Sequence, residues 1–306
     1  LVKPTLWTQQ QSNIHIDHLC LAQSRSKICL SYNQTATGWK FNVASDPIKL
    51  ATFPMAVIGG ELRVNIKASQ QDGHHMQGEF MLLGNHVRLQ KRYGHSNVAI
   101  KEHLISTLYL KGTLKDQWLN LEASIDQSKN NQAYAKLSYN TGSSQTIQGS
   151  IYFDFDSINL FSSLFKGIYN LKGHLKGHIN LSGTASSPQF DSNLAITDGN
   201  LELPEFGITI SNINLNAFNK QKDLLFFNGS GKSQQGDLVL SGTANPTNGH
   251  VMANVTANSF TLIDLPNTKL IGNANINLNH QTSFNSVTGS IELTDGHIKL
   301  NDQSMS

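Results

Sequence analysis

The feature that most constrains this chain is the alternation of apolar and polar residues across positions 173–215. Apolar side chains recur two positions apart, as in Leu194 and Ile196. Only a β-strand places residues i and i+2 on the same face. Residues typical of turns, such as Pro204 and Gly207, close the apolar runs. This segment therefore predicts short antiparallel strands that fold back on one another, each with one apolar and one polar face.

The alternation extends over most of the chain and is echoed at positions 272–300. A sheet with one apolar side can close into a barrel, stack into a sandwich or curl into a groove around an apolar ligand. Strands recurring every 10–12 residues or so would give about 25–30 strands. We therefore predict an all-β fold built as an elongated, curled antiparallel sheet with an apolar interior.

One stretch departs from the strand pattern. Between Asp156 and Asn170 apolar residues are spaced by three and four positions, which predicts one short amphipathic helix. Its apolar side can cap the neighbouring sheet or touch a membrane surface. We accordingly expect a β-groove segment at 1–155, and the helix followed by further β-groove at 156–306, within one elongated structure rather than two independent domains.

Two Asp-Gly pairs, Asp198-Gly199 and Asp295-Gly296, lie between alternating apolar pairs. Asp-Gly in this setting is a strong signal for the turn of a β-hairpin. The pattern Leu-x-Gly-Thr also occurs three times, beginning at Leu110, Leu181 and Leu240. Uneven repetition of this kind indicates an elongated repeat architecture rather than a regular solenoid.

Composition excludes several classes of function. The net charge of +2 is too small to attract nucleic acid, and charged residues make up only 14% of the chain against a usual share of about 25%. No apolar run reaches 18 residues, so no membrane-spanning helix is predicted. The chain starts without a signal peptide, and we expect it to be a fragment of a longer protein.

The two cysteines, Cys20 and Cys29, flank a polar stretch that resembles the tip of a hairpin. A disulfide between them would stabilise the hairpin by about 2–3 kcal/mol and would indicate an oxidising compartment such as the bacterial periplasm. Two buried free thiols in a cytosolic protein are the alternative.

Residues able to carry out chemistry are sparse. His174 and His178 lie four apart in a strand-like segment, which separates them too far to share a metal ion. Asp154 and Asp156 form a carboxylate pair, for which helix capping or solvation is the simpler interpretation. We therefore predict no enzyme, no cofactor and no metal site.

Three regions resemble the TamB family, which belongs to the AsmA-like group. They are the cysteine hairpin with Trp39, the stretch 148–208 with its Gly-Thr, Pro and Pro-x-x-Gly turns, and the stretch 229–242. The resemblance is to the C-terminal half of these proteins. It implies a taco-shaped sheet, the β-taco, with an apolar inner groove in the periplasm of a Gram-negative bacterium.

The resemblance also implies partners. The family is linked to phospholipid transport between the two membranes and to assembly of outer-membrane barrels and autotransporters with the barrel protein TamA. The anchor in the inner membrane would lie outside this fragment. Three hypotheses follow: a lipid conduit, a scaffold that templates strands of client barrels, and a structural β-repeat without a ligand, in that order of preference.

The residues expected to line a lipid groove are the apolar positions of the alternating strands. They are Leu175, Ile179, Leu181, Leu194, Ile196, Ile208, Ile210, Leu238, Leu240, Val255, Ile276, Leu278, Ile291 and Leu293. Small residues such as Ala253, Ala257 and Ala274 are expected to leave room for acyl chains.

Overall fold

The computed structural model describes residues 7–10, 12–23, 26–50, 57–71, 73–90, 102–128, 131–159, 168–221, 224–234 and 236–299. These residues form nineteen β-strands and no α-helix, which confirms the predicted all-β, antiparallel fold. The strands are fewer than expected because they are long, reaching 17 residues in β13. No helix in this part of the chain is long and apolar enough to span a bilayer.

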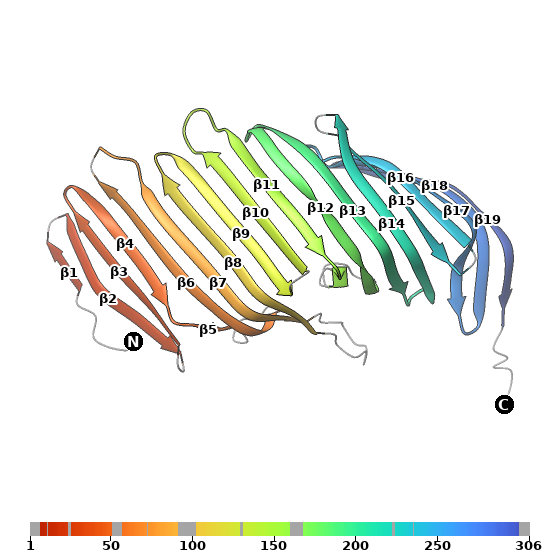
Figure 1. Ribbon diagram of the computed structural model, residues 1–306, viewed down its shortest axis with the longest axis horizontal. Helices are drawn as coiled ribbons and strands as arrows, with labels where there is room; N and C mark the ends of the chain where they lie inside the picture. The colour runs from red at the N-terminus through yellow and green to blue at the C-terminus, as the bar shows by residue number, and fades with distance from the viewer. Residues whose placement is uncertain are drawn as a thin grey trace. The chain divides into compact units, whose positions relative to one another are not determined.

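The chain divides into two compact units, whose strands are labelled in Figure 1. Unit 1 consists of Leu1–Tyr152 and Leu181–Pro188, and unit 2 of Phe153–Asn180 and Gln189–Ser306. The chain passes from one unit to the other within or beside three strands, namely β11 (Ile147–Phe155), β12 (Tyr169–Thr184) and β13 (Ser187–Leu203).

Unit 1 contains ten further strands, each antiparallel to the next along the chain, with β4 and β5 both pairing with β6. Their bounds are β1 (Trp7–Gln10), β2 (Asn13–Gln23), β3 (Ser26–Thr35), β4 (Gly38–Ser45), β5 (Ile48–Lys49), β6 (Val57–Gln71), β7 (Gln77–Gln90), β8 (Glu102–Lys115), β9 (Trp118–Ser128) and β10 (Asn131–Asn140). Antiparallel pairing of this kind needs no crossover connection between the paired strands.

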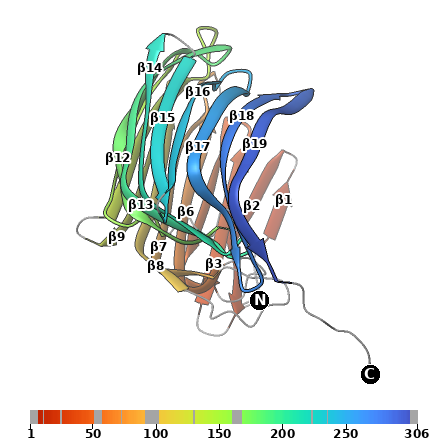
Figure 2. The same ribbon diagram turned by 90° about the vertical axis from the view of Figure 1, so that its right-hand side faces the viewer.

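Unit 2 continues from β13 as an antiparallel meander. Its remaining strands are β14 (Ile208–Gln221), β15 (Leu224–Ser233), β16 (Gly236–Asn245), β17 (His250–Leu265), β18 (Thr268–Gln281) and β19 (Phe284–Ile298). Figure 2 shows these strands side by side, with β17 to β19 curving along their length.

The strands are only partly covered. A small core lies in unit 2, where Ile208, Ala257 and Phe260 are buried together. Leu203, Ile210, Leu238, Leu262 and Ala274 pack against that core. Most other apolar side chains on the strands are only half-buried.

Bulges bend the strands of unit 2. Asp198 in β13, Asn212 in β14 and Ser259 in β17 have φ angles of 52°, 50° and 46°. Each lies where the strand register shifts, and a bulge of this kind bends a strand and increases its twist. Gly199 allows close packing at the bend, because a Cβ there would lie 2.7 Å from the Cβ of Ile213.

The prediction that Asp198-Gly199 and Asp295-Gly296 are hairpin turns is wrong. Both pairs lie inside strands, the first in β13 and the second in β19. At Asp198-Gly199 the pair forms a bulge, which requires the same tolerance of positive φ as a tight turn. The turn expected around Pro204 is present, and it joins Leu203 to Ile208.

The helix expected between 156 and 170 falls mainly on residues 160–167, outside the described residues. Of its ends, Ile158 and Asn159 lie in a 3₁₀ turn, whereas Tyr169 and Asn170 already belong to β12.

Candidate functional site

The apolar face of unit 2 follows from the strand register. Residues directly opposite one another in an antiparallel pair lie on the same face of the sheet. One such row crosses six strands from β13 to β18: Ile196, Leu215, Gly229, Leu240, Val255 and Ile276. The next row contains Leu194, Ala217, Phe227, Gly242, Ala253, Leu278 and Val287. Unit 2 therefore has a continuous apolar face at least two rows wide.

Thirteen of the fourteen residues expected to line the groove lie on this face of unit 2. Eleven share it through the strand register or through packing on the core: Leu194, Ile196, Ile208, Ile210, Leu238, Leu240, Val255, Ile276, Leu278, Ile291 and Leu293. Leu175 and Ile179 share it with Gly177, whose side-chain position points at Leu194. Leu181 lies further along the same strand but belongs to unit 1.

These positions differ in exposure. Ile208 is 8% exposed and packs against Phe260, so it is part of the core and not open surface. At the other extreme, Ile291 and Leu293 on β19 are each 59% exposed. The residues between them, such as Leu240, are half-buried. The accessible part of the face therefore runs from the middle strands of unit 2 to β19.

Small residues on this face do not all create space. Ala257 is 3% exposed within the core, so it leaves no room for an acyl chain. The glycines are also covered, because a Cβ on Gly242 would lie 2.4 Å from Cζ of Phe227. A Cβ on Gly229 would likewise lie 2.9 Å from Cδ1 of Leu215. The side chains of Phe227 and Leu215 cover these glycines, so the glycines leave no hollow in the apolar face.

Unit 1 has an apolar face of its own, which was not included among the expected groove residues. The row that defines it consists of Leu30, Val43, Ile66, Phe80, Gly112, Leu121 and Leu137. The alternation of Val64 with Ile66 and of Leu119 with Leu121 is the signal that identifies these strands in the sequence. Both units therefore carry an apolar face of the same construction.

Charged side chains of unit 1 gather on the opposite, polar face. Lys67 Nζ lies 2.9 Å from Oε1 of Glu79, and Lys136 Nζ lies 3.5 Å from Oε1 of Glu122. The hydrogen bond and the charge of Lys67 hold the pKa of the Glu79 carboxyl below its ordinary value. Ionic groups are thus separated from the apolar face by the thickness of one sheet.

A cavity of about 700 Å³ in unit 1 also belongs to the polar face. Its walls are two cross-strand rows of polar side chains, which include Lys40, Gln77 and Lys115 in one row and Lys67 and Glu79 in the other. The apolar-face residues that contribute to it lie between these rows and form its floor. Its position separates it from the apolar face described above.

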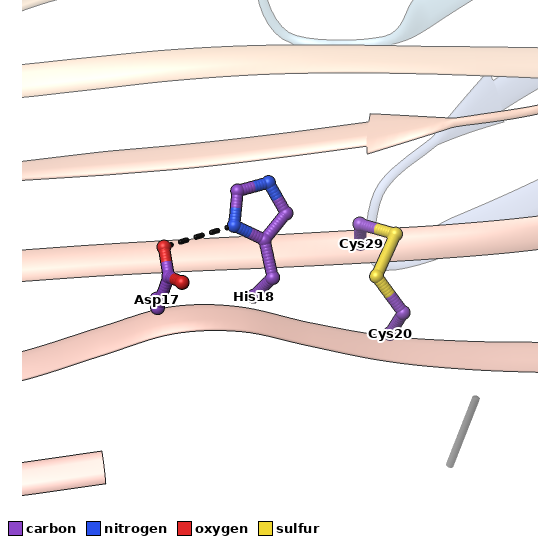
Figure 3. The surroundings of a disulfide bond; sticks show 4 residues. All are labelled: Asp17, His18, Cys20 and Cys29. Atoms are coloured by element: carbon purple, nitrogen blue, oxygen red, sulfur yellow. Dashed lines mark hydrogen bonds and ion pairs between the residues drawn. A yellow bond between two sulfur atoms is a disulfide. The ribbon is translucent and has the colours of Figure 1, made fainter. Parts of the chain in front are cut away.

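Cys20 and Cys29 form a disulfide bond, as predicted, and lie directly opposite each other on β2 and β3 (Figure 3). Cys29 is opposite Ala44, which is opposite Asn65, so the disulfide lies on the polar face. Figure 3 also shows the contact between Asp17 and His18 on the same strand, with 3.0 Å between the carboxylate oxygen and Nδ1. The disulfide thus joins two strands without occupying the apolar face.

Both members of the carboxylate pair identified in the sequence contact side chains of β12. Asp154 lies 3.5 Å from Nζ of Lys176, and Asp156 lies 3.4 Å from Nδ1 of His174. Among the described residues, no group of three or more His, Cys, Asp and Glu side chains is arranged to hold a metal ion. What the apolar face offers is a broad hydrocarbon surface, suited to binding apolar chains.

Comparison with protein families gives one match. The family model of the TamB N-terminal domain matches residues 3–196 of the chain. This match covers most of unit 1 and the first strands of unit 2, and it does not support the expected placement in the C-terminal half of the family's proteins. No curated protein and no solved structure matches the chain.

Proposed function

The chain belongs to the TamB family, and we propose that its apolar face shields the acyl chains of phospholipids during their transport between the inner and outer membranes. The observation that carries this proposal is the continuous row of half-buried apolar side chains across unit 2, from Ile196 to Ile276. Such a row provides hydrocarbon contact on strand after strand without an intervening charge.

The energetics favour acyl chains as the ligand. Each CH₂ group that moves from water to an apolar surface gains about 0.8 kcal/mol. Half-buried side chains gain as well, because the bound lipid removes their remaining exposed area from water. Similar contacts on successive strands leave no deep trap, so a lipid can move from one row to the next.

The family also supports a setting for this activity. We place the protein in the periplasm of a Gram-negative bacterium, anchored to the inner membrane. The outer-membrane barrel protein TamA is the proposed partner at the other membrane. The role is that of a carrier and not of an enzyme.

The test is mass spectrometry of organic extracts from the chain expressed in a periplasm and purified without added lipid. Phospholipid is expected at about one molecule per chain or more. The double variant Leu240→Asp and Ile276→Asp places two charges on the apolar face and is expected to abolish retention. Its matched control is Val239→Asp, because Val239 neighbours Leu240 but lies on the polar face and is 49% exposed.

Circular dichroism establishes that each variant keeps its strands, and the milder Leu240→Ser covers the case in which aspartate disrupts the sheet. Retention lost in the apolar-face variants and kept in Val239→Asp supports the proposal. A folded wild-type chain without lipid, or equal loss in the control, contradicts it.

A second function, as a scaffold for outer-membrane barrel proteins, is favoured by β19. Within unit 2, the described residues pair β19 only with β18. The strand is long and exposes Val287, Ile291 and Leu293 by 71%, 59% and 59%. A strand edge can accept a strand from another chain.

The scaffold role predicts that Ser290→Pro in β19 reduces assembly of outer-membrane barrels in cells, whereas Ser290→Ala does not. Charges at Leu240 and Ile276 would then have little effect on assembly. The opposite pattern, with sensitivity to the apolar-face charges and tolerance of proline, favours lipid transport over scaffolding.

A further inference from the structure

The polar face of unit 2 carries rows of amides and hydroxyls. One row crosses β14 to β19 with an amide or hydroxyl side chain on every strand: Asn216, Asn228, Ser241, Asn254, Asn277 and Thr288. Neighbouring strands are about 4.8 Å apart, so these groups repeat at that interval across the sheet. This row is distinct from the apolar face because adjacent residues of a strand point to opposite sides.

A cavity of about 460 Å³ lies on this face, over β16 to β19. One wall is formed by the last four members of the amide row, from Ser241 to Thr288. The other wall is the parallel row formed by Thr243, Met252, Asn279 and Ser286. Its volume falls within the range of about 300–1,000 Å³ that is usual for ligand pockets. None of the residues that line it carries a charge.

The hydrogen bonds around the cavity order the amides and leave donors for a ligand. Asn254 Nδ2 donates to Oδ1 of Asn275 at 2.8 Å and to Oδ1 of Asn277 at 3.0 Å. The Nδ2 groups of Asn275 and Asn277 have no partner in the part of the chain that the structure describes. The Oδ1 atoms of Asn275 and Asn277 thus face Asn254, and the Nδ2 groups of both residues remain as donors for another molecule.

Met252 supplies an apolar patch within this polar surface. Its side chain is 48% exposed and lies between Thr243 and Asn279. A flexible thioether adapts its shape to irregular apolar surfaces. Amides and hydroxyls surround the patch on both sides, which makes the cavity amphipathic without making it ionic.

We propose that this cavity and the adjoining amide row bind a neutral β-linked oligosaccharide, with the glycan lying across the strands. A pyranose ring combines hydroxyls, which pair with amides, with C–H faces, which pack on an apolar side chain such as Met252. The length of one sugar residue in an extended β-linked chain is close to the strand spacing, so successive residues meet equivalent amides. This binding role is additional to lipid transport and uses the opposite face of the sheet.

The lack of charge in the cavity favours a neutral ligand over an anionic one. An anionic ligand needs cations in the lining, and the cavity has none. Charged pairs lie elsewhere on both polar faces, such as Lys67–Glu79 in unit 1 and Lys232–Asp237 in unit 2, but none lines this cavity. The lining therefore fits a neutral glycan.

The experiment is isothermal titration of the purified chain with chitopentaose, a neutral β-linked oligosaccharide. Saturable binding is expected. The double variant Asn254→Ala and Asn277→Ala removes two amides and should weaken binding at least about fivefold, because each hydrogen bond is worth about 0.5–1.5 kcal/mol. The matched control is Asn120→Ala, an exposed asparagine on the polar face of unit 1.

Saturation-transfer NMR on Met252→Ala provides a second readout, since loss of the thioether should reduce transfer to the C–H face of the sugar. Absence of saturable binding overturns the proposal. So does equal weakening by Asn120→Ala. Self-association of the chain that the double variant abolishes, without glycan binding, would instead assign the amide row to contact with a second copy.

Discussion

The backbone amide of Asp264 donates a hydrogen bond to the carbonyl oxygen of Phe206 across 2.8 Å. Phe206 lies in the turn between β13 and β14, and Asp264 lies near the end of β17, so this bond joins that turn to a strand that pairs with neither β13 nor β14. The contact is possible because the β15–β16 hairpin, which lies between the two, is short and turns between Ser233 and Gly236. The β13–β14 and β17–β18 hairpins are longer and meet beyond that turn.

Side chains also hold the end of β17 in place at this contact with the β13–β14 turn, which we call the junction. Gln234 Nε2 donates to Oδ2 of Asp264 at 2.6 Å, and Lys269 Nζ donates to Oε1 of Gln234 at 3.0 Å. The core of Ile208, Ala257 and Phe260 lies on the apolar face of the same strands. One end of the apolar face in unit 2 is therefore closed and packed, which leaves the longer arms of the strands for a ligand.

Gly207→Ala should open this junction. Gly207 has a φ of +70°, and a Cβ there would lie 1.9 Å from the carbonyl oxygen of Asp264. Gly249 has a φ of +73° with nothing within 4 Å, so Gly249→Ala carries the backbone cost without the clash. Gly249→Ala should cost about 1 kcal/mol, and Gly207→Ala about 1–3 kcal/mol more.

The measurement is the midpoint of urea unfolding for both variants, with hydrogen exchange at the end of β17 as a local readout. Faster exchange around Asp264 in Gly207→Ala alone is the expected result. Identical midpoints and exchange rates in the two alanine variants would show that the junction does not contribute to stability.

Reduction of the disulfide should loosen β2 and β3. The bond closes a loop between residues nine positions apart, which corresponds to about 2–3 kcal/mol of stabilisation in the chain-entropy treatment. Hydrogen exchange in the β2–β3 hairpin should therefore accelerate after treatment with dithiothreitol or in Cys20→Ala with Cys29→Ala. Unit 2 provides the internal control, and acceleration of the same size there would contradict a local role.

The carboxyl of Glu79 provides a pH test. Lys67 lowers its pKa from an ordinary value of 4.5, so the stabilisation it provides is present above that value and is lost as the pH falls through the lowered pKa. Lys67→Met removes the hydrogen bond and the charge, and the pKa should rise. NMR titration of the Glu79 carboxyl measures the shift, for which Lys136→Met is the control; an unchanged pKa in Lys67→Met would refute the pairing.

Much of the fold could be predicted because a sheet with one apolar face requires apolar and polar residues to alternate along each strand. Strands such as β4 and β6 follow directly from alternation around Val43 and Ile66. The bulges could not be separated from turns, because Asp198-Gly199 meets the requirements of both. Whether a strand bends or reverses depends on pairing with β14, which is a tertiary property.

The sequence predicted which residues lie on the apolar face, but it did not predict how exposed each side chain is. Alternation identified Leu240 and Ile208 equally, yet Leu240 is half-buried on the open part of the face and Ile208 is packed in the core. Ile208 is buried because it packs against Phe260 of β17, a strand that does not pair with β14, and no local pattern encodes that contact. Ala257 shows the same limit, since a small residue in the sequence can mark dense packing as well as space.

Photo-crosslinking in cells shows whether acyl chains contact the apolar face. A photoreactive amino acid is placed at position 240 on the apolar face and, separately, at the neighbouring position 239 on the polar face. Phospholipid adducts are expected at position 240 and none at 239. Adducts of equal yield at both positions, or protein adducts alone at position 240, would contradict it.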